Sequence, residues 1–155
     1  MSFSKQLTSY RDPPTQFRPH PAATIDAAVD SAASNNYFPI AFDGGHHEDI
    51  GGDPVGTAGG VVMRSVATDR FQLDGAPAGA LDCKKFLEVT LPLISVGRLC
   101  VHGLMVAFNR HGVFVFDQHG TVIAKGKRDP IRNLYLIPVP VHTAITQQRQ
   151  RVDTV

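Results

Sequence analysis

The sequence predicts a mainly β domain with one short helix, carried between an extended N-terminal arm and a polar C-terminal tail. Two observations predict this class. Most apolar segments are short, rich in β-branched and aromatic residues, and separated by glycine turns. Only one segment places its apolar residues at helical spacing. A chain of 155 residues suits one domain, and we assign residues 1–23 to the arm, 24–141 to the β-domain and 142–155 to the tail.

The N-terminal half begins with proline-rich chain. Four prolines between residues 13 and 21 fix φ and remove donors, so this arm should be extended. The segment "TIDAAVD" (24–30) predicts a short strand that ends in an acidic turn. Residues 42–60 contain seven glycines without periodicity, which indicates a long loop or a flexible hairpin. Residues 61–73 alternate well enough for one or two strands, and "KKFLEVTL" (84–91) is typical of a strand.

The C-terminal half combines the helix with a meander of strands. The segment "PLISVGRLCVHG" (92–103) starts with proline and ends with glycine. We expect a short helix near 94–101 whose core face carries Leu93, Val96, Leu99 and Cys100. Four strand-like segments follow, "LMVAF", "GVFVFD", "TVIAKG" and "LYLIPV". The turns "NRHG" and "QHG" between them should place glycine in the left-handed conformation.

Composition and charge restrict the classes of function. A net charge of +1 argues against a general nucleic-acid role, because binding by counterion release needs clustered positive charge. No apolar run approaches the roughly 20 residues that cross a bilayer, so we expect no membrane insertion. The N-terminus lacks the apolar segment of a secretory signal, and two cysteines are too few for a disulfide framework. We therefore expect a soluble, intracellular protein, in the cytoplasm or inside an organelle.

The segment "GGHHEDIGGD" gathers side chains that could bind a metal, namely His46, His47, Glu48, Asp49 and Asp53. Adjacent histidines project differently in a flexible loop, and no helix with ligand spacing supports them. The segment "GTAGG" lacks the Lys-Ser/Thr pair of a phosphate-binding loop. We expect neither a metal nor another cofactor.

The candidate catalytic residue is Asp30, in "VDSAAS" (29–34), and two interpretations of it are open. In the first, Asp30 is a turn residue that closes a strand. In the second, it is half of a carboxylate pair. Two carboxylates that share one proton can act as acid and base toward a bound water. A chain with a single copy of the turn must dimerise to make such a pair.

A longer stretch downstream resembles a known family. The elements that carry the resemblance follow in order across residues 93–135: Leu93-Ile94-Ser95-Val96, Leu99-Cys100, Gly103, Gly120-Thr121-Val122-Ile123, Gly126-Lys127-Arg128 and Leu134-Tyr135. This pattern is similar to the end of the protease region of Copia-type retrotransposon polyproteins. The Asp30 turn and the glycine-rich residues 55–67 lie where that family has its aspartate turn and its flap hairpin. The resemblance covers roughly residues 26–140 and is stronger in the second half.

The resemblance implies a retropepsin-like (acid protease) closed β-domain in which the 24–30 strand neighbours the strand before "LISVGRL", residues 84–91, and Asp30 lies near the 92–97 segment. Asp30, with Ser31 and Ala32, would form the catalytic turn, and Gly59 and Gly60 would belong to the flap. The family has glycine at the position of Ala32. A Cβ there crowds a tightly packed turn that faces its twofold mate. If the position also needs a positive φ, alanine strains the turn by about 1–2 kcal/mol. Catalysis is more sensitive than folding to such a displacement.

Ala32 therefore favours a non-catalytic function. We expect a domesticated retropepsin-like domain that acts as a structural or docking subunit of a larger protein assembly. One alternative is an active homodimeric aspartic endopeptidase of retrotransposon type that uses Asp30. Another is a β-domain that binds peptides or small molecules in the old cleft. For the docking function, we expect Tyr10, Phe17 and Arg18 of the arm to contact a neighbouring chain, since aromatic and arginine side chains often anchor interfaces.

Overall fold

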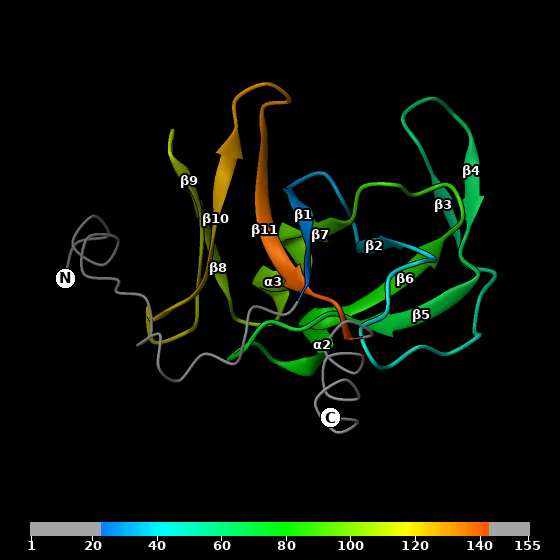
Figure 1. The fold of residues 1–155 in the computed structure, drawn as a ribbon, viewed down its shortest axis with the longest axis horizontal. Helices are drawn as coiled ribbons and strands as arrows, with labels where there is room; N and C mark the ends of the chain where they lie inside the picture. The colour runs from blue at the N-terminus through cyan, green and yellow to red at the C-terminus, as the bar shows by residue number, and fades with distance from the viewer. Residues whose placement is uncertain (1–22, 143–155) are drawn as a thin grey trace, which may run out of the picture.

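The computed structural model describes residues 23–142 and confirms a mainly β domain. Nine strands form one sheet in the order β5-β6-β2-β7-β1-β11-β10-β9-β8 (Figure 1). In that order their bounds are Ala67–Arg70, Asp82–Phe86, Asn36–Pro39, Leu93–Ser95, Thr24–Asp30, Leu134–Pro140, Val122–Asp129, Gly112–Phe116 and Met105–Phe108. The expectations for the arm and for most of the tail lie outside the described residues.

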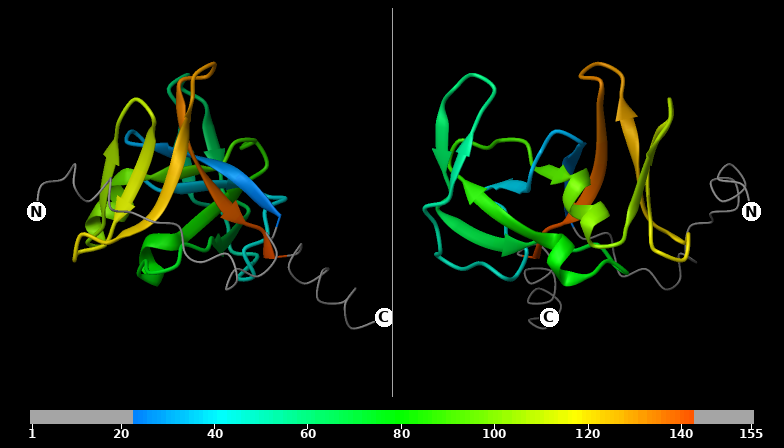
Figure 2. Two further views of the ribbon diagram at one scale, coloured as in Figure 1. Left: turned by 60° about the vertical axis from the view of Figure 1, so that its left-hand side comes forward. Right: turned by 180° about the vertical axis from the view of Figure 1, so that it is seen from behind.

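Two short helices and a separate hairpin complete the described part of the chain. The helices are α2 (Ala78–Leu81) and α3 (Val96–Val101), of which the sequence predicted only the second. The strands β3 (Pro54–Gly56) and β4 (Val62–Arg64) pair with each other as a two-stranded sheet. This hairpin and the β8–β9 pair lie at opposite ends of the molecule (Figure 2). Within residues 23–142 no helix is long and apolar enough to cross a membrane.

Strand β1 lies in the middle of the sheet. It pairs antiparallel with β11 on one side and parallel with β7 on the other, with Asp30 opposite Ser95. Three consecutive residues of β1, Ala27 to Val29, are buried, as expected of a strand with neighbours on both edges. Asp30 therefore lies beside the 92–97 segment, as expected. The prediction that the strand of residues 84–91 neighbours the 24–30 strand is wrong, because β2 and β7 lie between β6 and β1 in the sheet.

Strand β6 differs from the prediction for residues 84–91. It starts at Asp82, directly after α2, and ends at Phe86. Its neighbours explain the end, because Pro39 of β2 pairs with Phe86 and Ala67 of β5 pairs with Lys85. Beyond these residues no strand supplies partners, and Leu87 is 68% exposed.

Helix α3 begins one residue after β7, at Val96. The side chain of Ser95 accepts a hydrogen bond from the Arg98 amide and so caps the helix. Leu99 is the buried residue of α3, whereas Cys100 is exposed. The prediction that Cys100 is a core residue is wrong, because the late start of the helix leaves only one turn to face the core.

The two hairpin turns in the meander use glycine differently. Gly120 has φ of 79° and follows the prediction of a left-handed glycine. Gly112 has no positive φ, and the prediction for "NRHG" is wrong in this respect. Gly112 is needed for another reason: a side chain there would collide with the carbonyl of Gly126 on the neighbouring strand β10.

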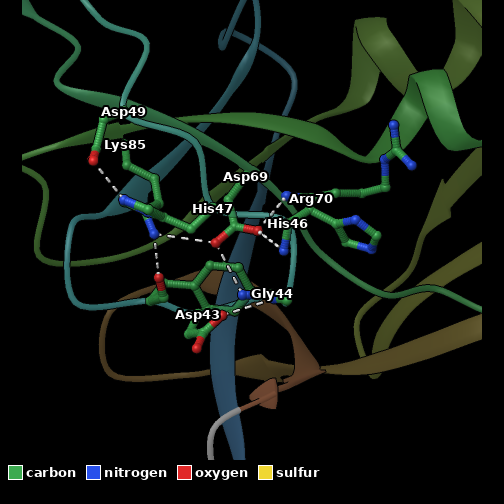
Figure 3. Close-up of polar contacts among 10 residues, drawn as sticks. Asp43, Gly44, His46, His47, Asp49, Asp69, Arg70 and Lys85 are labelled. Atoms are coloured by element: carbon green, nitrogen blue, oxygen red, sulfur yellow. Dashed lines mark hydrogen bonds and ion pairs between the residues drawn. The ribbon is translucent and has the colours of Figure 1, made fainter.

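A charged pair is buried inside the β5–β6 end of the domain. The Lys85 ammonium donates to Asp69 Oδ2 at 3.1 Å and to the Phe42 carbonyl at 2.6 Å, and both charged side chains are almost inaccessible to solvent. The same carboxylate accepts backbone N–H bonds from Gly44, His46 and Arg70 (Figure 3). The pair thus attaches the loop that follows β2 to strands β5 and β6.

We predict that Lys85→Met lowers the free energy of unfolding by about 3–5 kcal/mol, because it leaves the buried Asp69 charge without its partner. Lys84→Met is the matched control, since Lys84 pairs with Asp53 at the surface and should contribute about 1 kcal/mol or less. Urea unfolding of both variants measures the difference. Equal losses for the two variants would show that the backbone donors alone satisfy Asp69.

Candidate functional site

The carboxylate of Asp30 is presented at the end of the central strand β1. Asp30 is half-buried, and the next two residues, Ser31 and Ala32, are exposed. The Ala32 amide donates a hydrogen bond to Asp30 Oδ1 at 2.8 Å. This is an aspartate turn, in which the side chain replaces the backbone acceptor. One carboxylate oxygen is therefore held by the backbone at the tip of the strand.

Ala32 adopts this turn without the strain expected from the sequence. Among residues 23–142, Asn133 is the one non-glycine residue with a positive φ. The alanine methyl group therefore meets no conformational penalty of the kind that a left-handed position imposes. Within a single chain, Ala32 therefore does not strain the Asp30 turn.

Two fully buried polar side chains support the turn from below, and sequence reasoning missed both. Ser95 donates from Oγ to the Ala33 carbonyl at 2.6 Å, and its amide donates to Asn36 Oδ1 at 2.8 Å. The Asn36 side chain in turn donates to the carbonyls of Ala80 and Asp82. The two residues therefore connect the turn to β7, α2 and β6. A signal was available, since both polar residues adjoin runs of apolar residues and must find partners when buried.

The glycines predicted for the flap lie at the tip of the β3–β4 hairpin. Thr57 and Val61 close the tip through an amide-to-carbonyl bond of 2.9 Å, and Gly59 and Gly60 lie between them. Gly60 has φ of 80°, which favours glycine. The turn after β1 and the hairpins β3–β4 and β10–β11 project from the same side of the domain (Figures 1 and 2).

The histidine-rich loop is held by hydrogen bonds within the chain. His47 Nε2 lies 2.8 Å from Asp49 Oδ1, and the His46 amide is bound by Asp69 (Figure 3). Asp53 pairs with Lys84. Among the described residues no group of three or more His, Cys, Asp or Glu side chains could hold a metal ion.

The two cysteines, Cys83 and Cys100, have different environments. Both are free, Cys83 inside the core and Cys100 on the surface. Burial, followed by the nearby negative charge of Asp69, raises the pKa of the Cys83 thiol to about 12. Cys83 is therefore an inert protonated thiol and no candidate nucleophile.

The expected partner contacts Tyr10, Phe17 and Arg18 lie outside the described residues. No family model, curated protein or solved structure matches this chain. The function must therefore follow from the geometry of the chain itself and from the sequence pattern that surrounds Asp30.

We predict that Ala32→Gly lowers the free energy of unfolding by about 0.4–1 kcal/mol. Glycine increases the entropy of the unfolded chain and relieves no strain at this position. Gly60→Ala is a useful comparison, because its positive φ should cost alanine about 1–2 kcal/mol. Thermal or urea unfolding measures both. A stabilised Ala32→Gly variant would contradict the relaxed turn described above.

Proposed function

We propose that this chain is a retropepsin-like domain whose Asp30 turn supplies one carboxylate of a two-carboxylate site, completed by a second copy of the chain. Its function would be that of a homodimeric aspartic endopeptidase. Three features support this: the carboxylate turn at the end of β1, the parallel neighbour β7 that leads directly into α3, and the β3–β4 hairpin on the same side. The resemblance to the Copia-type protease region adds the sequence pattern of residues 93–135.

The observation that carries the proposal is the relaxed Asp30 turn. The sequence favoured a non-catalytic domain because alanine was expected to strain this turn and to crowd the same turn of a second copy. In the structure Ala32 has no positive φ, and its amide still donates to the Asp30 carboxylate. This removes the strain, which was one of the two arguments against catalysis, and on that ground we place the endopeptidase first.

The chemistry needs two such turns. When two carboxylates lie close together, they share one proton, so one is the acid and the other the base toward a water molecule between them. The water then attacks the peptide carbonyl while the protonated carboxyl stabilises the developing charge. The strands and turn of one chain present Asp30 alone, which is why the proposal includes a homodimer. It includes no metal or other cofactor.

We predict that the full chain cleaves an unfolded protein substrate at acidic pH, and that Asp30→Asn lowers the rate at least about 100-fold because an amide cannot activate water. Asp26→Asn is the matched control, since Asp26 lies on the same strand and its side chain is exposed. Cleavage should increase with protein concentration through dimerisation, which sedimentation can follow. Activity that survives Asp30→Asn would exclude this function.

A second function, a non-catalytic structural or docking subunit of a protein assembly, also has an observation in its favour. The Ala32 side chain is exposed next to Asp30, on the surface that a second copy would have to approach. A methyl group there occupies space that the family's glycine leaves open. In this function, arm residues Tyr10, Phe17 and Arg18 would hold the partner chain, and Asp30 would only close the turn.

The docking function predicts that deletion of residues 1–23 abolishes co-purification with the native partner assembly. A proline-restricted arm loses little entropy when it binds, so its removal should weaken association strongly. Deletion of residues 143–155 is the control, because it also removes a terminal segment but leaves residues 1–23 in place. Undiminished association after the N-terminal deletion would show that the arm does not hold the partner.

The proposal places the domain inside the cell. The two cysteines of the chain are both free thiols in the structure, as expected of a reducing compartment.

A further inference from the structure

A pocket of about 500 Å³ lies over the β5–β6 strand pair, and Asp30 is not among the residues that line it. Two cross-strand pairs form its floor, Thr68 opposite Lys84 and Arg70 opposite Asp82. Its walls come from the loop after β2, from Asn35 of the turn region and from Arg98 of α3. The Arg70 and His46 side chains extend to the same side of the strand pair (Figure 3).

Two guanidinium groups in this pocket share a single carboxylate. Arg70 Nε donates to Asp82 Oδ1 at 3.0 Å, and Arg98 Nη2 lies 3.9 Å from Asp82 Oδ2. Each guanidinium has five N–H donors in a planar fork, and one carboxylate cannot bind two forks in the bidentate geometry. The backbone fixes Arg98 as well, through a 3.0 Å bond from Nε to the Gly79 carbonyl. Both arginines are thus positioned, and together they exceed Asp82 by one positive charge.

Of the other charged side chains that line the pocket, Glu48 alone lacks an ion-pair partner of its own within residues 23–142, and its carboxylate brings the formal charge of the lining to zero. Asp69 is neutralised by the buried Lys85, and Lys84 pairs with Asp53 at 2.8 Å. Glu48 lies at the pocket but is exposed, so water and salt screen its carboxylate more than they screen the partly buried arginines. Arg98 keeps 29% of its side-chain surface accessible and Arg70 38%, which leaves both within reach of a ligand.

We propose that this pocket binds the carboxylate of an acidic side chain in a peptide. A planar carboxylate matches the guanidinium fork, and the pocket is large enough for an Asp or Glu side chain. Asn35 and His46 of its walls and Thr68 of its floor supply further hydrogen-bonding groups. One chain forms the whole site, so this proposal does not depend on the dimeric endopeptidase site.

The test uses the full chain, an acetylated triglutamate peptide and its triglutamine counterpart at low ionic strength. In NMR titrations, the backbone amide chemical shifts of Asn35, Thr68 and Lys84 should change as the glutamate peptide is added. They should not change when the glutamine peptide is added. The double variant Arg70→Gln with Arg98→Gln should weaken binding about tenfold or more, because charge-assisted bonds are lost. Arg110→Gln is the matched control, on the β8–β9 turn at the opposite end of the sheet, and should leave binding unchanged.

The variant Asp82→Asn should strengthen peptide binding, whereas the double arginine variant should weaken it. A variant that merely folded poorly would not bind the peptide more tightly. It removes the carboxylate that competes for both arginines, and the glutamate peptide should bind about threefold to tenfold more tightly. Unchanged or weaker binding by Asp82→Asn would overturn the proposal. Inorganic phosphate that displaces the peptide at similar concentration would overturn it too, since the site would then select any oxyanion rather than an acidic peptide.

Discussion

The parallel pairing of β1 with β7 is the constraint on which the rest of this domain depends. It places Asp30 opposite Ser95 and so joins the end of the central strand to the start of α3. The Ser95 hydroxyl donates to the Ala33 carbonyl of the turn and accepts from the Arg98 amide of the helix, and the Ser95 amide donates to Asn36. Because a fully buried polar group without a partner costs about 1–3 kcal/mol, a different register would lose several of these bonds at once.

Two polar clusters at the β5–β6 strand pair, one buried and one partly exposed, have different consequences at the surface. Lys85 and Asp69 bind each other and the backbone, and so they hold the loop after β2. On the opposite face of the same strand pair, Arg70 and Arg98 share one carboxylate, Asp82. Alternation of side chains along β5 and β6 separates the two clusters. The buried pair joins a loop to the strands, and the partly exposed cluster leaves two guanidinium groups accessible in a pocket.

The position of Ala32 shows why a substitution cannot be judged from a motif alone. An alanine in place of glycine is costly where φ is positive and nearly free where it is not. In this chain the turn keeps the hydrogen bond from the Ala32 amide to Asp30, and φ is not positive. The conformation of the turn therefore gives no reason to expect an effect of the methyl group.

The sequence by itself determined the class of the fold, because periodicity and turn chemistry are local properties. The mainly β character, the meander of residues 104–139, the helix near 94–101 and the Asp30 turn could all be predicted from neighbours along the chain. The early end of β6, the exposure of Cys100 and the support of the turn by Asn36 and Ser95 could not. The same holds for the arginines that meet at Asp82, which come from β5 and α3. Only the tertiary structure decided these, because each depends on which distant strand supplies a partner, and local sequence does not carry that information.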